Sequence, residues 1–278
     1  MGENVGFVTC RLHGPGAANF GLANQMFGVA TALSYAKDTD QIALFPCLAN
    51  TQEYGNYCEN IFCKLNIDEP QTTVEHFYQE PRFQYTKIPT ANNIALSGYF
   101  QSEKYFKHNR ELILDTLTLP PQVEDYIEMK YSRLLYMENT VAVHIRRGDY
   151  TNIFKGCFEI LGTEYYNKAF DEFQSDSVFV FFSDMDPAEH TAYCNENFSV
   201  QKSFHVNGES DIVDLFLMSK MKNNIIANSS FSWWSAWLNA NPDKKVIAPQ
   251  KWFAPTHPSL GNSDEAPKDM MPQGWKRL

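Results

Sequence analysis

Five short runs of apolar residues divide the second half of the chain at regular intervals. They lie at residues 141–145, 177–182, 204–206, 224–227 and 245–248. The segments between them repeat apolar positions with helical spacing, as in Tyr165, Tyr166, Ala169 and Phe173. Such an alternation of strands and helices predicts a parallel sheet covered by helices on both faces.

Residues that commonly cap helices stand where these helical segments begin. Thr163, Asp186 and Ser210 are the candidate N-caps. Pro187 follows Asp186 at the first helical position and Glu189 stands three residues after the cap, which is a capping-box pattern. The helix starts therefore support the alternating arrangement.

The first half of the chain shows a weaker form of the same alternation. Strands are predicted at 5–10, 42–45 and 94–100 and helices at 24–37 and 102–118, whereas 50–90 has no clear periodicity. Pro120 and Pro121 interrupt the second helical segment. We therefore expect two α/β domains, at residues 1–130 and 131–278.

The acidic balance of the chain argues against one broad class of partner. A formal net charge of −10 is unlike a nucleic-acid-binding surface, so no nucleic acid is expected. The six cysteines include no Cys-x-x-Cys pair. We expect them to be mostly buried free thiols, without disulfides and without a metal cluster.

The start of the chain and its hydropathy indicate where the protein resides. Met-Gly-Glu-Asn-Val lacks the charged and apolar segments of a signal peptide, and no apolar run reaches roughly 18 residues. A soluble, cytoplasmic protein is expected. Peripheral association with a membrane is compatible with this expectation, and the sequence does not define an oligomeric state.

Polar and cationic side chains follow three of the predicted strands at their carboxyl ends, where ligands of open parallel sheets bind. The residues of this rim are His144, Arg146, Arg147 and Asp149 on the first strand, Ser183 and Asp184 on the second, and Asn228, Ser229, Ser230 and Phe231 on the fourth. Arginine forks and N–H groups at a helix start bind phosphate oxygens well. The rim is therefore predicted to hold a nucleoside diphosphate.

Each segment also has an ordinary structural interpretation. The two arginines and Asp149 could form a charged turn, the serines could only cap a helix, and His144 could be a satisfied core residue. The tryptophans 233, 234 and 237 are interpreted as core packing rather than ligand contacts. The convergence of three strands on one rim favours a binding site over these alternatives.

The ordered set of motifs resembles the α-1,2-fucosyltransferase family, glycosyltransferase family 11. The matching segments span almost the whole chain and are GLANQMF at 21–27, LSGYFQSEKYF at 96–106, HIRRGDY at 144–150, FSD at 182–184, DLFLMS at 214–219 and IIANSSFSWWSAWLN at 225–239. The resemblance implies a GT-B fold, in which two Rossmann-like parallel-sheet domains face a central cleft. The first domain would serve the acceptor and the second would bind a GDP-sugar.

The resemblance also implies an activity. Such an enzyme transfers L-fucose, with inversion, from GDP-β-L-fucose to the 2-hydroxyl of a terminal galactose in an oligosaccharide. Arg146 would stabilise the leaving GDP, and Asp149 is a candidate general base. The residues expected to bind the donor are Asn24, Gln25, His144, Arg146, Arg147, Ser183, Asp184, Asn228, Ser229, Ser230 and Phe231.

No cofactor and no metal are expected in this activity. Asp184-Met185-Asp186 has the Asp-x-Asp form that many sugar transferases use to bind Mn²⁺, but Asp186 is better explained as a helix cap. Two other functions stay open at this point: a GT-B transferase that uses another GDP-sugar, and a non-catalytic glycan-binding protein. The latter does not explain two arginines and a serine-rich helix start on one rim.

Overall fold

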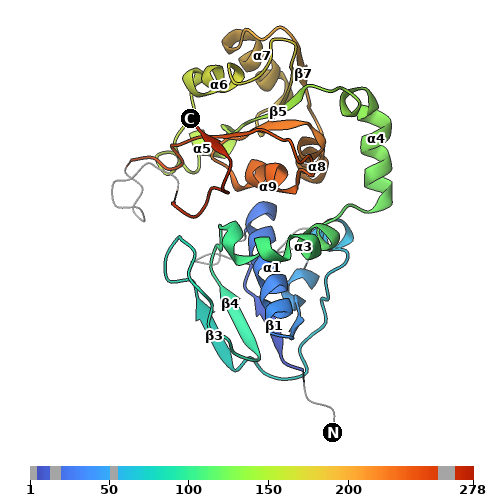
Figure 1. Cartoon of the computed structure of the whole chain (residues 1–278), viewed down its shortest axis with the longest axis vertical. Helices are drawn as coiled ribbons and strands as arrows, with labels where there is room; N and C mark the ends of the chain where they lie inside the picture. Colours follow the sequence, from blue (N-terminus) through green and yellow to red (C-terminus); the bar gives the residue numbers. More distant parts are fainter. Residues whose placement is uncertain (1–4, 13–19, 51–55, 256–266) are drawn as a thin grey trace. The chain divides into compact units, whose positions relative to one another are not determined.

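The computed structural model describes residues 5–12, 20–50, 56–255 and 267–278 and divides into two compact units (Figure 1). The first unit comprises Met1–Gln122 and Pro267–Pro272, and the second comprises Val123–Ala266 and Gln273–Leu278. A short segment near the C-terminal end thus belongs with the first unit, which the sequence gives no reason to expect.

A four-stranded parallel sheet forms the first unit. Its strands are β1 (Phe7–Cys10), β2 (Ile42–Ala43), β3 (His76–Gln79) and β4 (Ile94–Ser97), in the order β2-β1-β4-β3. Helix α1 (Leu22–Asp38) packs on this sheet (Figure 1). Its side chains are apolar almost all round, so the helix is buried along most of its length.

Two parts of the first unit differ from the sequence prediction. The helix predicted over 102–118 is broken into the 3₁₀ turns Glu103–Tyr105 and Lys107–Asn109 and the short helix α3 (Arg110–Thr116). Ser102 accepts a hydrogen bond from the Lys104 N–H and so starts a 3₁₀ turn. Strand β3 was missed because its side chains are largely exposed at a sheet edge and show no alternation.

Helix α4 (Pro121–Leu135) occupies the segment in which the sequence indicated only a domain boundary. Pro121 stands at the first helical position, where its missing N–H costs nothing. Only Ile127, Tyr131 and Leu134 of this helix are buried. The apolar stripe of this helix is therefore too narrow to give a clear helical periodicity in the sequence.

The second unit is a six-stranded, fully parallel sheet in the order β10-β9-β8-β5-β6-β7. Its strands are β5 (Thr140–Ile145), β6 (Val178–Ser183), β7 (Ser203–His205), β8 (Asn223–Ile225), β9 (Val246–Ala248) and β10 (Lys276–Arg277). Helices α6 (Thr163–Phe170) and α7 (Pro187–Asn197) cover one face, and α8 (Asp211–Lys220) and α9 (Ser230–Leu238) cover the other (Figure 1). The predicted strand–helix alternation is confirmed.

The core of this unit explains the aromatic content of the chain. Val141, Val143 and Ile145 alternate on the face of β5 that packs with Tyr165 and Tyr166. The two tyrosine hydroxyls donate to backbone carbonyls of residues 226 and 144, just where the strand ladder ends. The tryptophans of α9 are fully buried against one another, which confirms that they are core residues.

Two of the three predicted helix caps are present. Asp186 accepts from the Ala188 N–H at 2.9 Å, and Ser210 accepts from the Val213 N–H at 3.3 Å. The third prediction is wrong by one residue, because Gly162 is the N-cap of α6 and Thr163 is already helical.

One half-buried carboxyl in the first turn of α8 makes the stability of this unit depend on pH. Burial, together with Glu209 and Asp211, raises the pKa of Asp214 to about 7. The stabilisation associated with the protonated carboxyl is complete below the ordinary value of 3.8 and is lost as the pH rises toward 7. Asp214→Asn should therefore increase the melting temperature by about 5 °C at pH 8 and by much less at pH 4.5. Thermal unfolding at both pH values, with exposed Asp243→Asn as control, tests this; equal effects at both would contradict it.

Two remaining predictions concern membranes and cysteines. No helix among the described residues is long and apolar enough to cross a membrane. All six cysteines are free, as predicted. Only Cys10 and Cys194 are buried, however, so the expectation of mostly buried thiols is wrong.

Candidate functional site

The strand order of the second unit creates a natural ligand site. The chain runs from β5 outward to β6 and β7, then returns to place β8 on the other side of β5. Loops that leave β5 and β8 therefore diverge to opposite faces of the sheet, and the carboxyl ends of such strands are where open parallel sheets bind ligands. The residues predicted as a binding rim follow these strands and the neighbouring β6.

Arg146 is the first residue after β5 and lies between two carboxylates. Its Nη2 donates to Asp149 Oδ2 at 2.7 Å, and its Nε lies 3.3 Å from Asp184 Oδ2. The guanidinium also lies over the Tyr150 ring, with its carbon 5.3 Å from the ring centroid. About a quarter of the Arg146 side chain remains exposed. The guanidinium is thus positioned by the protein yet accessible to an anionic ligand.

Asp184, at the end of β6, fastens the loop that follows β5. Its Oδ1 accepts from the Arg147 N–H at 2.9 Å, and the Gly148 N–H also donates to this carboxylate. Burial alone would raise the pKa of Asp184, but Arg146 and the two N–H groups outweigh it, so the pKa lies below its ordinary value. Asp184 is therefore ionised at neutral pH and ties the ends of two adjacent strands together.

Gly148 begins the short helix α5 (Gly148–Thr151) and lies directly against this carboxylate. A Cβ atom there would lie 2.5 Å from Asp184 Oδ2 and 3.0 Å from the Asp184 carbonyl oxygen. Both distances are shorter than van der Waals contact. Glycine is thus required by the close approach of the two loops.

His144 points to the opposite face of the sheet from the tyrosine-rich core. It is buried, its ring centroid lies 5.8 Å from that of Phe231, and its Nδ1 has no hydrogen-bond partner among the described residues. Burial and the nearby Arg146 hold the pKa of His144 far below its usual value. The imidazole is therefore neutral, and it lies in the core with its Nδ1 unsatisfied by the described residues.

The start of α9 supplies the third side of the rim. Ser229 is the N-cap and accepts from the Phe231 N–H at 3.3 Å, whereas Ser230 and Phe231 are half-buried. Asn228 has a different position, because its amide donates to the backbone carbonyls of Glu159 and Trp252. Ser229 and Ser230 therefore lie at the helix N-terminus that follows β8, and Asn228 holds two loops in place.

Tyrosines that the sequence did not single out complete the site. Tyr150 donates from its hydroxyl to the Asn228 carbonyl at 2.9 Å and thereby joins the loops after β5 and β8. The Arg147 guanidinium lies over the Tyr193 ring, 4.8 Å from its centroid. Tyr150 follows Asp149 directly in the chain, so its place in the sequence could have indicated a role in the site. Nothing in the sequence around Tyr193 indicates such a role.

Three predicted site residues have other surroundings. Asn24 and Gln25 lie on α1 in the first unit, where Asn24 accepts from Gln101 and Gln25 donates to the Phe20 carbonyl. Ser183 accepts from the Met185 N–H in the turn after β6. In the Asp-x-Asp segment, Asp186 caps α7 and Asp184 binds the loop after β5, so both carboxylates have structural partners.

Comparison with solved structures defines the class of fold. The chain is similar to the fucosyltransferase NodZ from Bradyrhizobium, with a TM-score of 0.55 over 84% of this chain and 93% of NodZ at 13% sequence identity. Two parallel-sheet α/β units with this likeness define a GT-B fold, and the predicted fold class is confirmed.

Sequence comparison defines the family. The model of glycosyl transferase family 11 matches residues 18–266, so the chain belongs to that family. An alpha-1,2-colitosyltransferase from Escherichia coli is 30% identical over 99% of both chains. The O-antigen biosynthesis glycosyltransferase WbnK from Escherichia coli is 37% identical over 60% of this chain and 58% of its own length. The galactoside alpha-(1,2)-fucosyltransferase 2 of Sus scrofa is 28% identical over 56% of this chain and 48% of its own length.

Proposed function

We propose that this family 11 glycosyltransferase transfers L-fucose, with inversion, from GDP-β-L-fucose to the 2-hydroxyl of a terminal galactose in a glycan. The observation that carries the proposal is the position of Arg146 at the switch point of the sheet, between two carboxylates and beside a serine-rich helix start. An α-1,2 linkage appears in the names of three relatives, one of them colitosyl and two fucosyl. NodZ, whose fold is similar, was soaked with GDP-fucose.

Arg146 is assigned to the diphosphate. Negative charge develops on the leaving GDP as the bond to the sugar breaks, and a guanidinium held in place by two carboxylates needs little reorganisation to meet it. The Ser229 and Ser230 segment offers N–H groups at a helix N-terminus, which suit a second phosphate. Arg147 adds charge, and the neutral His144 offers an uncharged nitrogen to a hydroxyl or base.

A donor site without a metal ion is part of the proposal. In enzymes that use an Asp-x-Asp pair, the carboxylates bind a cation that neutralises the diphosphate. Here Asp184 is engaged by Arg146 and by backbone N–H groups, and Asp186 caps a helix. Arg146 supplies the positive charge instead. Activity measured in excess EDTA should equal activity in Mn²⁺, and a strict Mn²⁺ requirement would exclude this part.

Asp149 is assigned as the base that accepts the proton of the acceptor hydroxyl. Its Oδ2 binds Arg146, whereas its Oδ1 is buried and has no hydrogen-bond partner among the described residues. No described protein group therefore competes for that oxygen, and we assign it to the proton of the attacking hydroxyl. In Asp149→Asn, kcat should fall on the order of 10²-fold while the affinity for GDP is retained. A comparable loss of GDP affinity would leave Asp149 only as the partner that orients Arg146.

Colitose is the second candidate for the transferred sugar, because the colitosyltransferase aligns with the full length of this chain. Colitose is L-fucose without the 3-hydroxyl, so one hydroxyl group distinguishes the two donors. A site that binds this hydroxyl rejects the deoxy sugar strongly, whereas a site without such a contact accepts both. The ratio of the two kcat/KM values therefore defines the donor.

The test combines donors and acceptors. The protein is incubated with GDP-fucose, GDP-colitose or GDP-mannose and a panel of galactosides, and products are identified by mass spectrometry and linkage analysis. We expect a fucosylated product at the 2-hydroxyl of galactose. Donor binding without transfer to any galactoside would overturn the acceptor assignment, and transfer from GDP-colitose alone would overturn the donor assignment. A protein that binds glycans and never releases GDP would be a lectin rather than an enzyme.

A further inference from the structure

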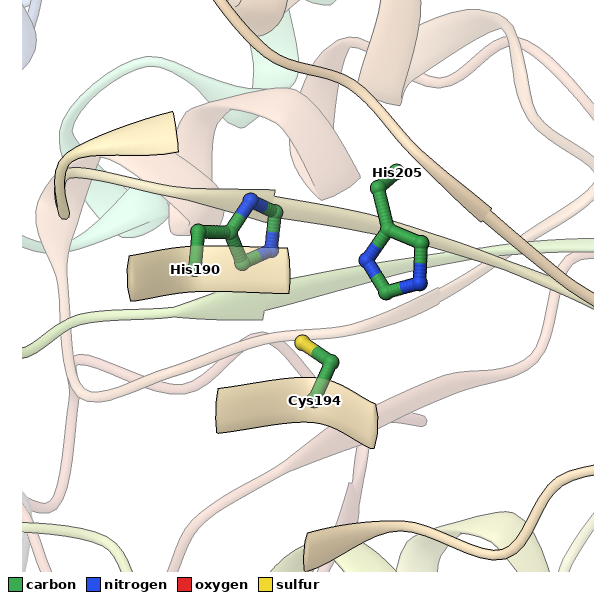
Figure 2. Close-up of side chains that lie close together, drawn as sticks. All are labelled: His190, Cys194 and His205. Atoms are coloured by element: carbon green, nitrogen blue, oxygen red, sulfur yellow. The ribbon is translucent and has the colours of Figure 1, made fainter. Parts of the chain in front are cut away.

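A buried cluster of two histidines and a cysteine lies on the face of the second sheet that α7 covers (Figure 2). His190 and Cys194 are four residues apart on α7, and His205 ends the edge strand β7. Each residue offers one ligand atom, and these atoms all lie within 4.8 Å of one another. Figure 2 shows the two imidazoles and the thiol pointing toward a common space. No part of the proposed sugar transfer uses these side chains.

Hydrogen bonds fix which nitrogen of His190 faces the cluster. Thr191 donates to the Pro187 carbonyl at 3.0 Å and accepts from the Asn207 amide at 3.1 Å. The Asn207 oxygen is thereby directed at His190 Nδ1, 2.8 Å away, which must carry the proton. His190 Nε2 then has a free lone pair, because a neutral imidazole carries only one N–H.

The nitrogens directed into the cluster lack partners. His190 Nε2 and His205 Nδ1 are both buried and neither makes a hydrogen bond to any described residue. His190 is only 1% exposed, and Cys194 is 2% exposed. Leaving a buried acceptor unpaired costs roughly 1–3 kcal/mol, so two unpaired nitrogens facing each other call for a bound partner.

We propose that His190, Cys194 and His205 form a binding site for a zinc ion, which fastens α7 to the edge strand β7. Two imidazole nitrogens and one thiolate are a ligand set that zinc prefers, and a water molecule completes a tetrahedral site. The bond from His190 Nδ1 to Asn207 is the orienting contact that histidine ligands of metals generally make. His205 is only half-buried, so the ion can enter from its side.

The geometry requires small movements only. Ligand atoms of a tetrahedral zinc site lie about 3.3 to 3.6 Å apart, given bonds of about 2.0–2.3 Å. The present separations reach at most 4.8 Å, so rotations of the three side chains are enough to close the site. The Phe181 ring stacks on His205 with centroids 5.3 Å apart and limits the rotation of that imidazole.

Zinc binds a thiolate and the unprotonated nitrogen of a neutral imidazole. Binding at Cys194 therefore displaces the thiol proton to solvent, whereas His190 binds through its Nε2, because its Nδ1 holds the proton that it donates to Asn207.

The test measures metal directly rather than activity. The whole chain is stripped with a chelator and then titrated with Zn²⁺, and with Co²⁺ as a spectroscopic probe. We expect one equivalent of zinc per chain and a rise of about 5 °C in melting temperature at saturation. The cobalt form should show a thiolate charge-transfer band and the visible bands of a tetrahedral ion.

Matched variants separate this site from adventitious binding. Cys194→Ala replaces the buried thiol with a small apolar group and should remove the charge-transfer band and the zinc-dependent rise in melting temperature. Cys63→Ser and His76→Asn change exposed residues of the first unit and should leave both intact. A stripped protein that takes up no zinc, or a cobalt spectrum unchanged in a folded Cys194→Ala, would overturn the proposal.

Discussion

Replacing Arg146 with alanine should lower kcat on the order of 10²–10³-fold while the protein stays folded. The guanidinium is the only cationic group of the described residues that lies between Asp149 and Asp184, and its loss removes the charge that would meet the leaving diphosphate. The two carboxylates are then left without their shared cation. Their repulsion weakens donor binding further, so KM for the donor should also rise.

The division of the lost activity between kcat and KM shows at which point of the reaction Arg146 acts. Because Arg146 is assigned to charge that develops during bond breaking, most of the loss should be in kcat, and the rise in KM should lower kcat/KM somewhat further. Arg146→Lys keeps the charge but loses the planar fork, so its activity should be intermediate. Arg133→Ala, at an exposed position on α4, is the control and should retain wild-type rates. Steady-state kinetics and GDP calorimetry provide the measurements, and a folded Arg146→Ala with wild-type turnover would contradict the assignment.

Adding one methyl group at Gly148 should reduce kcat/KM by roughly 10²-fold. The new Cβ would lie 2.5 Å from Asp184 Oδ2 and 3.0 Å from the Asp184 carbonyl oxygen, so the loop after β5 must move away from the end of β6. Arg146 and Asp149 move with that loop. Displacements of about 1 Å at a reacting site cost this much in rate, although the fold outside the loop is unchanged.

The control for this substitution is Gly162→Ala. No atom lies within 4 Å of the Cβ that would be added there, and Gly162 is likewise a loop residue of the second unit. It should keep its activity and its melting temperature. Comparing the two variants separates the effect of steric crowding at Gly148 from the general cost of replacing a loop glycine with alanine. Full activity in a folded Gly148→Ala would mean that the loop tolerates the displacement and that the positions of Arg146 and Asp149 are not critical.

The sequence predicted the second unit well because its central strands β5, β6, β8 and β9 are largely buried. A strand such as β5, with six consecutive buried residues, stands out against the polar loops on either side. The rim followed from the same pattern, since polar residues after such strands must gather at one edge. The sequence does not predict which carboxylates pair with Arg146, because it does not show how the loops after two strands approach each other.

Other features depended on tertiary structure and were missed for that reason. Strand β3 is an exposed edge, and α4 buries only three side chains, so neither has a strong periodic signal. The histidine–cysteine cluster joins residues from a helix and a strand. Two of its three residues, His190 and Cys194, stand at helical spacing in the sequence, but His205 can be added only once the order of β6 and β7 is known.

The return of residues 267–272 to the first unit has a consequence for biosynthesis. Asp269 accepts a hydrogen bond from Ser102 through its carbonyl group at 2.7 Å and forms an ion pair with Lys104. These contacts span more than 160 residues of chain. During synthesis from the N-terminus, the unit that emerges first from the ribosome therefore lacks part of its packing until nearly the entire polypeptide has been translated.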